Sequence, residues 1–147
     1  MNSRNSNSSV LRILLVDDFE PFWKTVRSLI LGRAELVIIS EASDGFVAIK
    51  KAEELRPDLI LMDIGLPSLN GIESARRILR NNSQMKILFL TEESSSDFVG
   101  EAFHLGARAY VVKRDARTDL LLGIDAVVRG ETFVSRSAKK PATPNTA

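Results

Sequence analysis

Three aspartates, one threonine and one lysine stand at the ends of short apolar runs in the sequence. Asp17 and Asp18 follow LRILLV, and Asp63 closes DLILMD. Thr91 closes KILFLT, and Lys113 closes ARAYVVK. Carboxylates gathered at one place repel one another unless a cation offsets their charge or their pKa values rise. Mg²⁺, a hard cation that prefers oxygen ligands, is therefore the metal that this set of residues favours.

The turn after Asp63 suits a carboxylate that both binds a metal ion and accepts a phosphoryl group. Gly65 lets the backbone pass close to the metal, so its carbonyl oxygen becomes a further ligand, and Pro67 stiffens the turn. In a transfer to a carboxylate, Lys113 would pair with one phosphoryl oxygen and Thr91 would hydrogen-bond another. The sequence holds no glycine-rich nucleotide loop, so the phosphoryl group has to come from another molecule.

The apolar runs alternate with segments of helical spacing, which predicts an α/β domain. Five strands are expected, at 11–16, 35–40, 58–63, 86–91 and 107–113. Five helices are expected, at 21–32, 45–57, 70–80, 97–105 and from about 116 to 130, with Asn70 as one N-cap and Asp115 or Thr118 as another. Strands this apolar predict a doubly wound parallel sheet covered on both faces. Ligands of such sheets bind at the carboxyl ends of the strands, where the five polar residues stand.

Composition predicts one folded domain with polar arms. The chain has 147 residues, 44% of them hydrophobic, which suits a single domain at 10–134. The segments 1–9 and 135–147 are polar, and we expect them to be disordered. The absence of cysteine excludes thiol catalysis and thiolate metal sites.

Charge and hydropathy argue against binding to nucleic acid and against insertion into a membrane. Lys plus Arg is 20 and Asp plus Glu is 19, a net charge of +1, which is not the balance of a chain that binds nucleic acid by charge. No apolar run is long enough to cross a bilayer, and the polar start is unlike a secretory signal. We therefore expect a cytoplasmic protein without membrane contact and without direct nucleic-acid binding by this chain.

Four motifs together resemble a bacterial two-component response regulator receiver domain. They are VDD at Val16–Asp18, LMDIGLPSLNGIE at Leu61–Glu73, the strand-end Thr91, and GARAYVVK at Gly106–Lys113. The ending YVVKRDA, followed by LLLGIDAVVRGETFVS, is most similar to receivers of the NarL/FixJ type. The resemblance covers about 11–133 and implies a flavodoxin-like, CheY-like sheet with strand order 2-1-3-4-5.

The resemblance also implies a role for each acidic residue of the site. Asp63 matches the phosphoacceptor, and Asp18 matches the acid that binds Mg²⁺ directly. Asp17 matches the acid that acts mostly through metal-bound water, and Gly65 supplies a backbone carbonyl to the metal. These residues form the expected metal site.

Three further positions match residues that respond to phosphorylation in the family. Thr91 and Lys113 match the residues that grip the phosphoryl group. Tyr110 matches the aromatic switch, which turns inward when Thr91 moves toward the phosphate, although a strand tyrosine is also ordinary core composition. The resemblance implies a surface made of the fourth helix, fifth strand and fifth helix that changes on phosphorylation and binds a downstream protein.

A sensor histidine kinase is the phosphoryl donor that the resemblance implies. The receiver would catalyse the transfer to itself and the later hydrolysis, so it is a phosphoacceptor switch and not an enzyme acting on a separate substrate. Because no output domain follows the receiver in this sequence, we expect the output to be protein binding or a phosphorelay.

Two residues, Glu92 and Arg114, depart from the family pattern. The position after the switch threonine is usually small, and here it is Glu92, a long acid that could crowd or repel a phosphodonor. Glu93 follows and could steer the hydrolytic water. The residue after the lysine is often a proline in a cis bond, and here it is Arg114, for which a cis bond would cost about 3 kcal/mol.

Two other functions fit parts of the sequence. The chain could be the receiver piece of a longer DNA-binding transcriptional regulator, since NarL/FixJ-type receivers normally continue into a helix-turn-helix domain. It could also be an Mg²⁺-dependent aspartyl-phosphate phosphatase of small molecules. Such enzymes commonly place a second acid two residues after the nucleophile, where this chain has Gly65.

Overall fold

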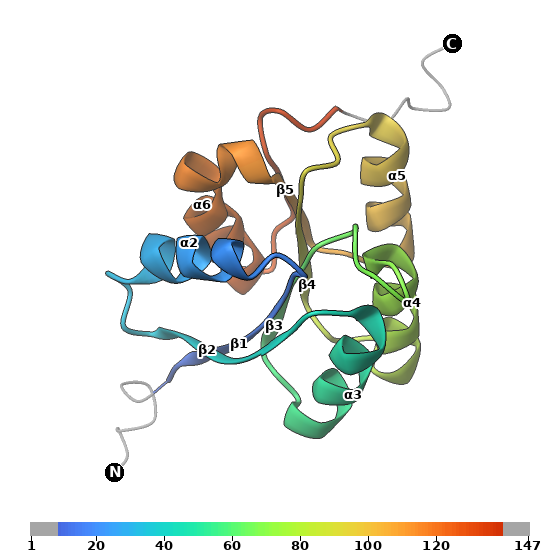
Figure 1. Cartoon of the computed structure of the whole chain (residues 1–147). Helices are drawn as coiled ribbons and strands as arrows, with labels where there is room; N and C mark the ends of the chain where they lie inside the picture. The colour runs from blue at the N-terminus through green and yellow to red at the C-terminus, as the bar shows by residue number, and fades with distance from the viewer. Residues whose placement is uncertain (1–8, 140–147) are drawn as a thin grey trace.

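A parallel sheet runs through the middle of the molecule, with helices on both faces (Figure 1). The computed structural model of the chain describes residues 9–139. Within these residues the sheet has six strands in the order β2-β1-β3-β4-β5-β6, all paired in parallel. The strands are β1 (Leu11–Val16), β2 (Leu36–Ala42), β3 (Leu59–Met62), β4 (Ile87–Thr91), β5 (Ala109–Val112) and β6 (Phe133–Val134). The predicted order of the first five strands is confirmed, and the short β6 was not predicted.

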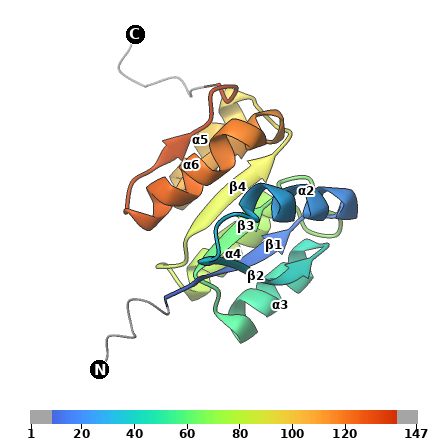
Figure 2. The ribbon, with the colours of Figure 1, turned by 90° about the vertical axis from the view of Figure 1, so that its left-hand side faces the viewer.

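The helices divide between the two faces of the sheet. Within residues 9–139 the five α-helices are α2 (Glu20–Ile30), α3 (Gly45–Leu55), α4 (Gly71–Asn81), α5 (Ser96–Leu105) and α6 (Ala116–Val128). A short 3-10 turn, η1 (Lys113–Asp115), joins β5 to α6. Helices α2 and α6 cover one face, and α3, α4 and α5 cover the other (Figure 1 and Figure 2).

Each of the strands β1 to β5 supplies side chains to both apolar cores. In β1, Ile13 and Leu15 belong to the core beneath α2 and α6, whereas Leu14 and Val16 belong to the core beneath α3, α4 and α5. All four residues of β3 are buried. Successive strand residues point to opposite faces, so a sheet covered on both sides needs continuous apolar runs. This requirement explains why the strands were readable from the sequence.

The helix starts confirm one predicted cap and correct another. The Asn70 side chain accepts a hydrogen bond from the Glu73 amide at 2.9 Å, as expected of the N-cap of α4. At α6 the structure places Asp115 at the predicted N-cap position, but its carboxylate makes no cap bond and instead accepts from Ser137. The hydroxyl of Thr118 donates to the Asp115 carbonyl and to a neighbouring carboxylate, so it caps nothing either.

Several predicted boundaries also differ from the structure. Strand β2 starts one residue later and ends two residues later than predicted, and Ile39 is an extra residue at a break in its register with β1. The expected end of the folded domain at 134 is too early, since Ser135 and Ala138 are buried. The expectation of disorder at 1–8 and 140–147 lies outside the described residues.

The remaining sequence expectations concern the backbone and the membrane. No peptide bond within residues 9–139 is cis, so the bond between Lys113 and Arg114 is trans and the chain enters η1 directly. Within the same residues no helix combines the length and the apolar character that crossing a bilayer requires.

Candidate functional site

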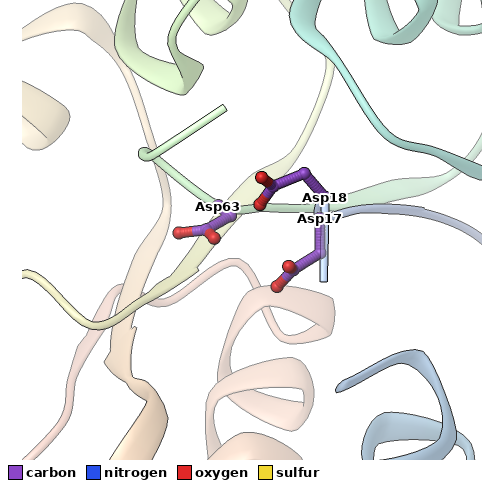
Figure 3. Close-up of side chains that lie close together, drawn as sticks. All are labelled: Asp17, Asp18 and Asp63. Carbon is purple, nitrogen blue, oxygen red and sulfur yellow. The ribbon is translucent and has the colours of Figure 1, made fainter. Parts of the chain in front are cut away.

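The three predicted aspartates meet at the carboxyl edge of the sheet. Val16 pairs with Met62 in the register of β1 and β3, so Asp17 and Asp63 are the next residues on two neighbouring strands. Carboxylate oxygens of Asp17, Asp18 and Asp63 all lie within 4.8 Å of one another (Figure 3). Asp17 and Asp63 are buried, whereas Asp18 is exposed. The parallel sheet thus concentrates negative charge at one point of its edge.

Lys113 supplies the only positive charge that the described residues place between these acids. Its Nζ lies 2.7 Å from Asp17 Oδ2 and 3.2 Å from Asp63 Oδ2. The same ammonium lies over the ring of Phe22, 4.4 Å from the ring centre. Three carboxylates and one ammonium leave a formal charge of −2 at the site, which a divalent cation would offset.

Backbone amides orient two of the carboxylates. Oδ1 of Asp63 accepts a hydrogen bond from the Ile64 amide at 2.7 Å and a longer one from the Gly65 amide at 3.4 Å. Oδ1 of Asp17 accepts from the Phe19 amide at 2.9 Å, at the start of α2. These bonds leave Oδ2 of both acids directed at Lys113.

Burial and charge act in opposite senses on the site's pKa values. Burial raises the pKa of Asp17 above its ordinary value, and the hydrogen bond from Lys113 only partly opposes that rise. Burial alone would lower the pKa of Lys113, but the hydrogen bond to Asp17 and the charge of Asp63 outweigh it and raise that pKa. The lysine is therefore charged at neutral pH.

A pocket opens beside Asp63 toward solvent. Its lining consists of Asp18, Phe19, Asp63, Gly65, Thr91, Glu92, Glu93 and Lys113. The predicted site residues thus share one pocket, except Asp17, which lies beneath it, and Tyr110. Thr91 is buried, and its Oγ1 accepts a hydrogen bond from the Glu93 amide at 3.4 Å. Glu92 and Glu93 are both exposed, so the mouth of the pocket carries two further acids.

Tyr110 lies inside the molecule. The residue is 0% exposed, and its ring centre lies 6.2 Å from that of Phe89. Its Oη donates a hydrogen bond of 2.7 Å to the Glu93 carbonyl oxygen. Burial, together with the charges of Glu93 and Asp63, raises the pKa of Tyr110 well above its ordinary value. The ring therefore occupies the inward position and is tied to the loop after Thr91.

Sequence reasoning missed one glycine that shapes the site. A Cβ at Gly71 would lie 1.9 Å from the Asp63 carbonyl oxygen, so no other residue fits there without a backbone shift. The Gly71 amide also donates to the Ile64 carbonyl at 2.8 Å. The first turn of α4 is thereby packed directly on the turn that carries Asp63. The only signal in the sequence was that Gly71 follows the predicted N-cap Asn70.

Sequence comparisons connect this arrangement with known proteins. The sequence profile of the response regulator receiver domain matches residues 13–125. The transcriptional regulatory protein LiaR of Bacillus subtilis is 34% identical over 122 residues, which cover 83% of this chain and 58% of LiaR. The transcriptional regulatory protein DegU of Brevibacillus brevis is 27% identical over 128 residues, or 87% of this chain and 54% of DegU. The chain spans little more than half the length of these curated relatives.

Solved structures give the same picture. The crystal structure of a two-component response regulator of the LuxR family from an Aurantimonas species matches with a TM-score of 0.83 at 34% identity, covering 87% of this chain and 91% of that chain. The isolated REC domain of RcsB from Salmonella enterica serovar Typhimurium matches with a TM-score of 0.82 at 20% identity, covering 88% and 96%. The second likeness shows a shared fold alone.

Proposed function

The chain belongs to the family of response regulator receiver domains, and from that premise we propose that Asp63 accepts a phosphoryl group from a sensor histidine kinase. The observation that carries the proposal is the position of Asp63. This residue directly follows a buried strand, and its carboxylate lies close to those of Asp17 and Asp18 and to the ammonium of Lys113. The Asp63 carboxylate is buried, accepts a hydrogen bond from a backbone amide, and lies beside a lysine and an open pocket. A carboxylate held in this way would attack an incoming phosphorus atom.

The proposed transfer moves a phosphoryl group from nitrogen to oxygen. An Asp63 carboxylate oxygen attacks the phosphorus of a phosphohistidine, a new P–O bond forms and the P–N bond breaks. The bonding pair returns to the imidazole, whose other ring nitrogen carries a proton, so a neutral histidine leaves. In the later hydrolysis a water oxygen attacks phosphorus, the P–O bond to Asp63 breaks, and inorganic phosphate is released. Glu93, which lines the pocket, would orient that water.

The residues present fit Mg²⁺. The carboxylates of Asp17, Asp18 and Asp63 and the carbonyl of Gly65 would hold the ion, and the formal charge of −2 at the site supports a divalent cation. When bound, Mg²⁺ would neutralise charge on the phosphoryl oxygens during transfer. Lys113 would pair with a phosphoryl oxygen as well, because its ammonium already faces Asp63.

The response to phosphorylation would pass through Thr91 and Tyr110. A phosphoryl group adds up to two negative charges at the site and attracts the Thr91 hydroxyl. Thr91 begins the loop that contains Glu93, and both residues line the pocket. Tyr110 is tied to the same loop through the Glu93 carbonyl. We propose that the surface of α5, β5 and α6 changes in consequence and is read by a partner protein.

The relatives' names add a second proposal for the output. LiaR and DegU are named transcriptional regulatory proteins, and this chain matches 58% and 54% of their lengths. Our expectation of no nucleic-acid binding therefore does not extend beyond these residues, and a longer protein containing this receiver could act on DNA. Sequencing the gene past the codon of residue 147 would decide this point: a helix-turn-helix domain would favour regulation of transcription, and a stop codon would favour output through protein binding.

Phosphorylation is tested by intact mass spectrometry after incubation with acetyl phosphate and Mg²⁺. We expect the mass of one phosphoryl group to be gained, and no gain when EDTA replaces Mg²⁺. The Asp63→Asn variant, which keeps the size of the side chain, should also gain nothing. A stable gain in the Asp63→Asn variant would contradict the assignment, and release of phosphate from a small substrate over many turnovers would favour the phosphatase alternative.

A further inference from the structure

The chain after α6 folds back onto the edge of the sheet beside the site. We call residues Phe133–Lys139 the strap. Its first two residues form β6, in which Phe133 pairs with Ala109 and Val134 pairs with Tyr110 of β5. In Figure 1 the strap, coloured orange-red, runs from the end of α6 along β5 toward the start of α5. It therefore covers the β5 edge of the sheet.

The middle of the strap is tied to β5 by Ser135. This residue is 2% exposed. Its amide donates to the Tyr110 carbonyl at 2.8 Å, and its Oγ accepts from the Val112 amide at 2.9 Å. Tyr110 is itself a residue of the proposed switch, and Val112 directly precedes the site lysine. A displacement of β5 would therefore be transmitted to the strap.

Two buried acids of the α6 start hold the next part of the strap. The Ser137 amide and hydroxyl donate to the two carboxylate oxygens of Asp115, at 2.7 and 2.8 Å. The Arg136 amide donates to Asp119 Oδ2 at 3.1 Å. Hydrogen bonds to ionised carboxylates are stronger than those between neutral groups. These bonds fix the strap against the start of α6.

The end of the strap reaches the loop that follows Thr91. The Lys139 amide donates to the Ser94 carbonyl at 2.9 Å. The neighbouring carbonyl, that of Glu93, accepts the hydrogen bond from Tyr110 Oη. Ala138 is buried in the same apolar core as Tyr110. The inward ring, the loop and the strap are thus joined in one set of contacts.

We propose that the strap is the output element of the receiver, and that phosphorylation of Asp63 strengthens its docking on β5 and on the loop after Thr91. This inference rests on the proposed function. A phosphoryl group that holds Thr91 fixes the loop, and the fixed loop presents the Glu93 carbonyl to Tyr110 and the Ser94 carbonyl to Lys139. Without the phosphoryl group the loop is less constrained, and the strap's last contact opens more often. A partner that reads the α5, β5 and α6 face therefore meets the strap rather than a bare strand edge.

The test is residue-resolved amide hydrogen exchange by NMR, with and without Mg²⁺ and beryllofluoride, a phosphoryl mimic. We expect the Lys139 amide to exchange about tenfold more slowly when the mimic is bound. The Asp58 amide, which donates to the Arg12 carbonyl at the amino ends of β1 and β3, away from the site, should not change. Unchanged or faster exchange at Lys139 would overturn the inference.

Loading of Asp63 is scored separately, by intact mass with acetyl phosphate. Mass gain together with unaltered Lys139 exchange would overturn the strap inference and leave the proposed function standing. Absence of mass gain would contradict the proposed function, and the inference with it.

A matched pair of serine variants tests the coupling from the other side. If phosphorylation strengthens the docked strap, a variant whose strap is largely undocked must bind the mimic more weakly, by up to the same factor. Ser137→Ala removes the hydroxyl that donates to Asp115, and we expect it to raise the Kd for beryllofluoride, followed by fluorine NMR, about fivefold. Ser83→Ala, in the exposed turn after α4, should leave the Kd unchanged. An equal Kd in all three proteins would overturn the inference.

Discussion

Lys113 is the residue on which the charge balance of the site depends. Its ammonium lies between Asp17 and Asp63 and is largely buried with them. Taking away one partner of a buried ion pair leaves uncompensated charge, which is more costly than the loss of a surface pair. The lysine therefore contributes to folding before any phosphoryl group arrives.

Replacing this lysine should destabilise the protein in the absence of a metal ion. We expect Lys113→Gln to lower the free energy of unfolding by about 3 kcal/mol, measured by urea denaturation at neutral pH in EDTA. Lys50→Gln is the control, because the Lys50 side chain is 74% exposed and should change the stability by less than about 0.5 kcal/mol. Equal stability of the two variants would contradict the balance described above.

Gly71 determines how closely α4 approaches the phosphoacceptor turn. Because a Cβ would lie 1.9 Å from the Asp63 carbonyl oxygen, Gly71→Ala must displace the turn or the helix. We expect a loss of about 2 kcal/mol in stability and a slower gain of mass from acetyl phosphate. Gly32→Ala meets no atom within 4 Å and should behave like the unaltered protein in both assays.

Glu92 adds a negative charge at the mouth of the pocket. Small donors such as acetyl phosphate are anions, and Glu92 lines the pocket through which they reach Asp63. We expect Glu92→Gln to accelerate phosphorylation by acetyl phosphate about threefold at low salt, with the gain shrinking as salt is added. Glu53→Gln removes the same charge on α3, away from this pocket, and should have no effect. A rate independent of Glu92 at every salt concentration would count against this effect of its charge.

Among the elements, the strap is the part that sequence reasoning did not find. The runs of β1, β3, β4 and β5 are apolar and have Asp, Thr or Lys at their ends, so the strands and the site were both predictable. The strap has two strand residues and a polar sequence, SRSAK, which reads as a tail by composition. What orders it is contact with residues far away in the sequence, chiefly Tyr110, Asp115 and Ser94. The same contact explains why the Asp115 carboxylate, at the N-cap position of α6, makes no cap bond.

The bond between Asp115 and the strap predicts a pH dependence of stability. Burial alone would raise the pKa of Asp115, but the hydrogen bonds from Ser137 outweigh it and hold that pKa below its ordinary value of 3.8. A carboxylate whose pKa is lower in the folded state adds stability that is complete above its unfolded-state pKa, and that stability is lost as the pH falls through the folded-state pKa. Asp115 should therefore stabilise the protein at neutral pH and contribute to its acid unfolding.

Substitution of Asp115 isolates this contribution. We expect Asp115→Asn to lower the free energy of unfolding by about 2 kcal/mol near neutral pH, with a deficit that shrinks as the pH falls below 3.8. The measurement is urea denaturation across that range, with the exposed Asp97→Asn as the charge-matched control. A deficit that stays constant at every pH would show that the carboxylate's charge is not what holds the strap.

At the scale of the whole molecule, the parallel sheet explains which parts of the site could be predicted from the sequence. All the strands end at the same edge, so residues far apart in the chain, such as Asp17, Asp63 and Lys113, had to meet there. This geometry is set by the pattern of strands and helices and is visible in the sequence. The close contact of Gly71 with Asp63 and the inward position of Tyr110 depend on packing between layers, which no local pattern encodes.

Asp63 is the residue that we propose to carry the phosphoryl group. The most direct test of this proposal is to phosphorylate the protein with acetyl phosphate and Mg²⁺, reduce the acyl phosphate with borohydride, and locate the product by peptide mass spectrometry. Borohydride converts an aspartyl phosphate into homoserine, so the modified position remains visible after digestion. We predict homoserine at position 63 and at no other aspartate. Homoserine at Asp17 or Asp18, or an unmodified Asp63 in protein that has gained the phosphoryl mass, would contradict the account.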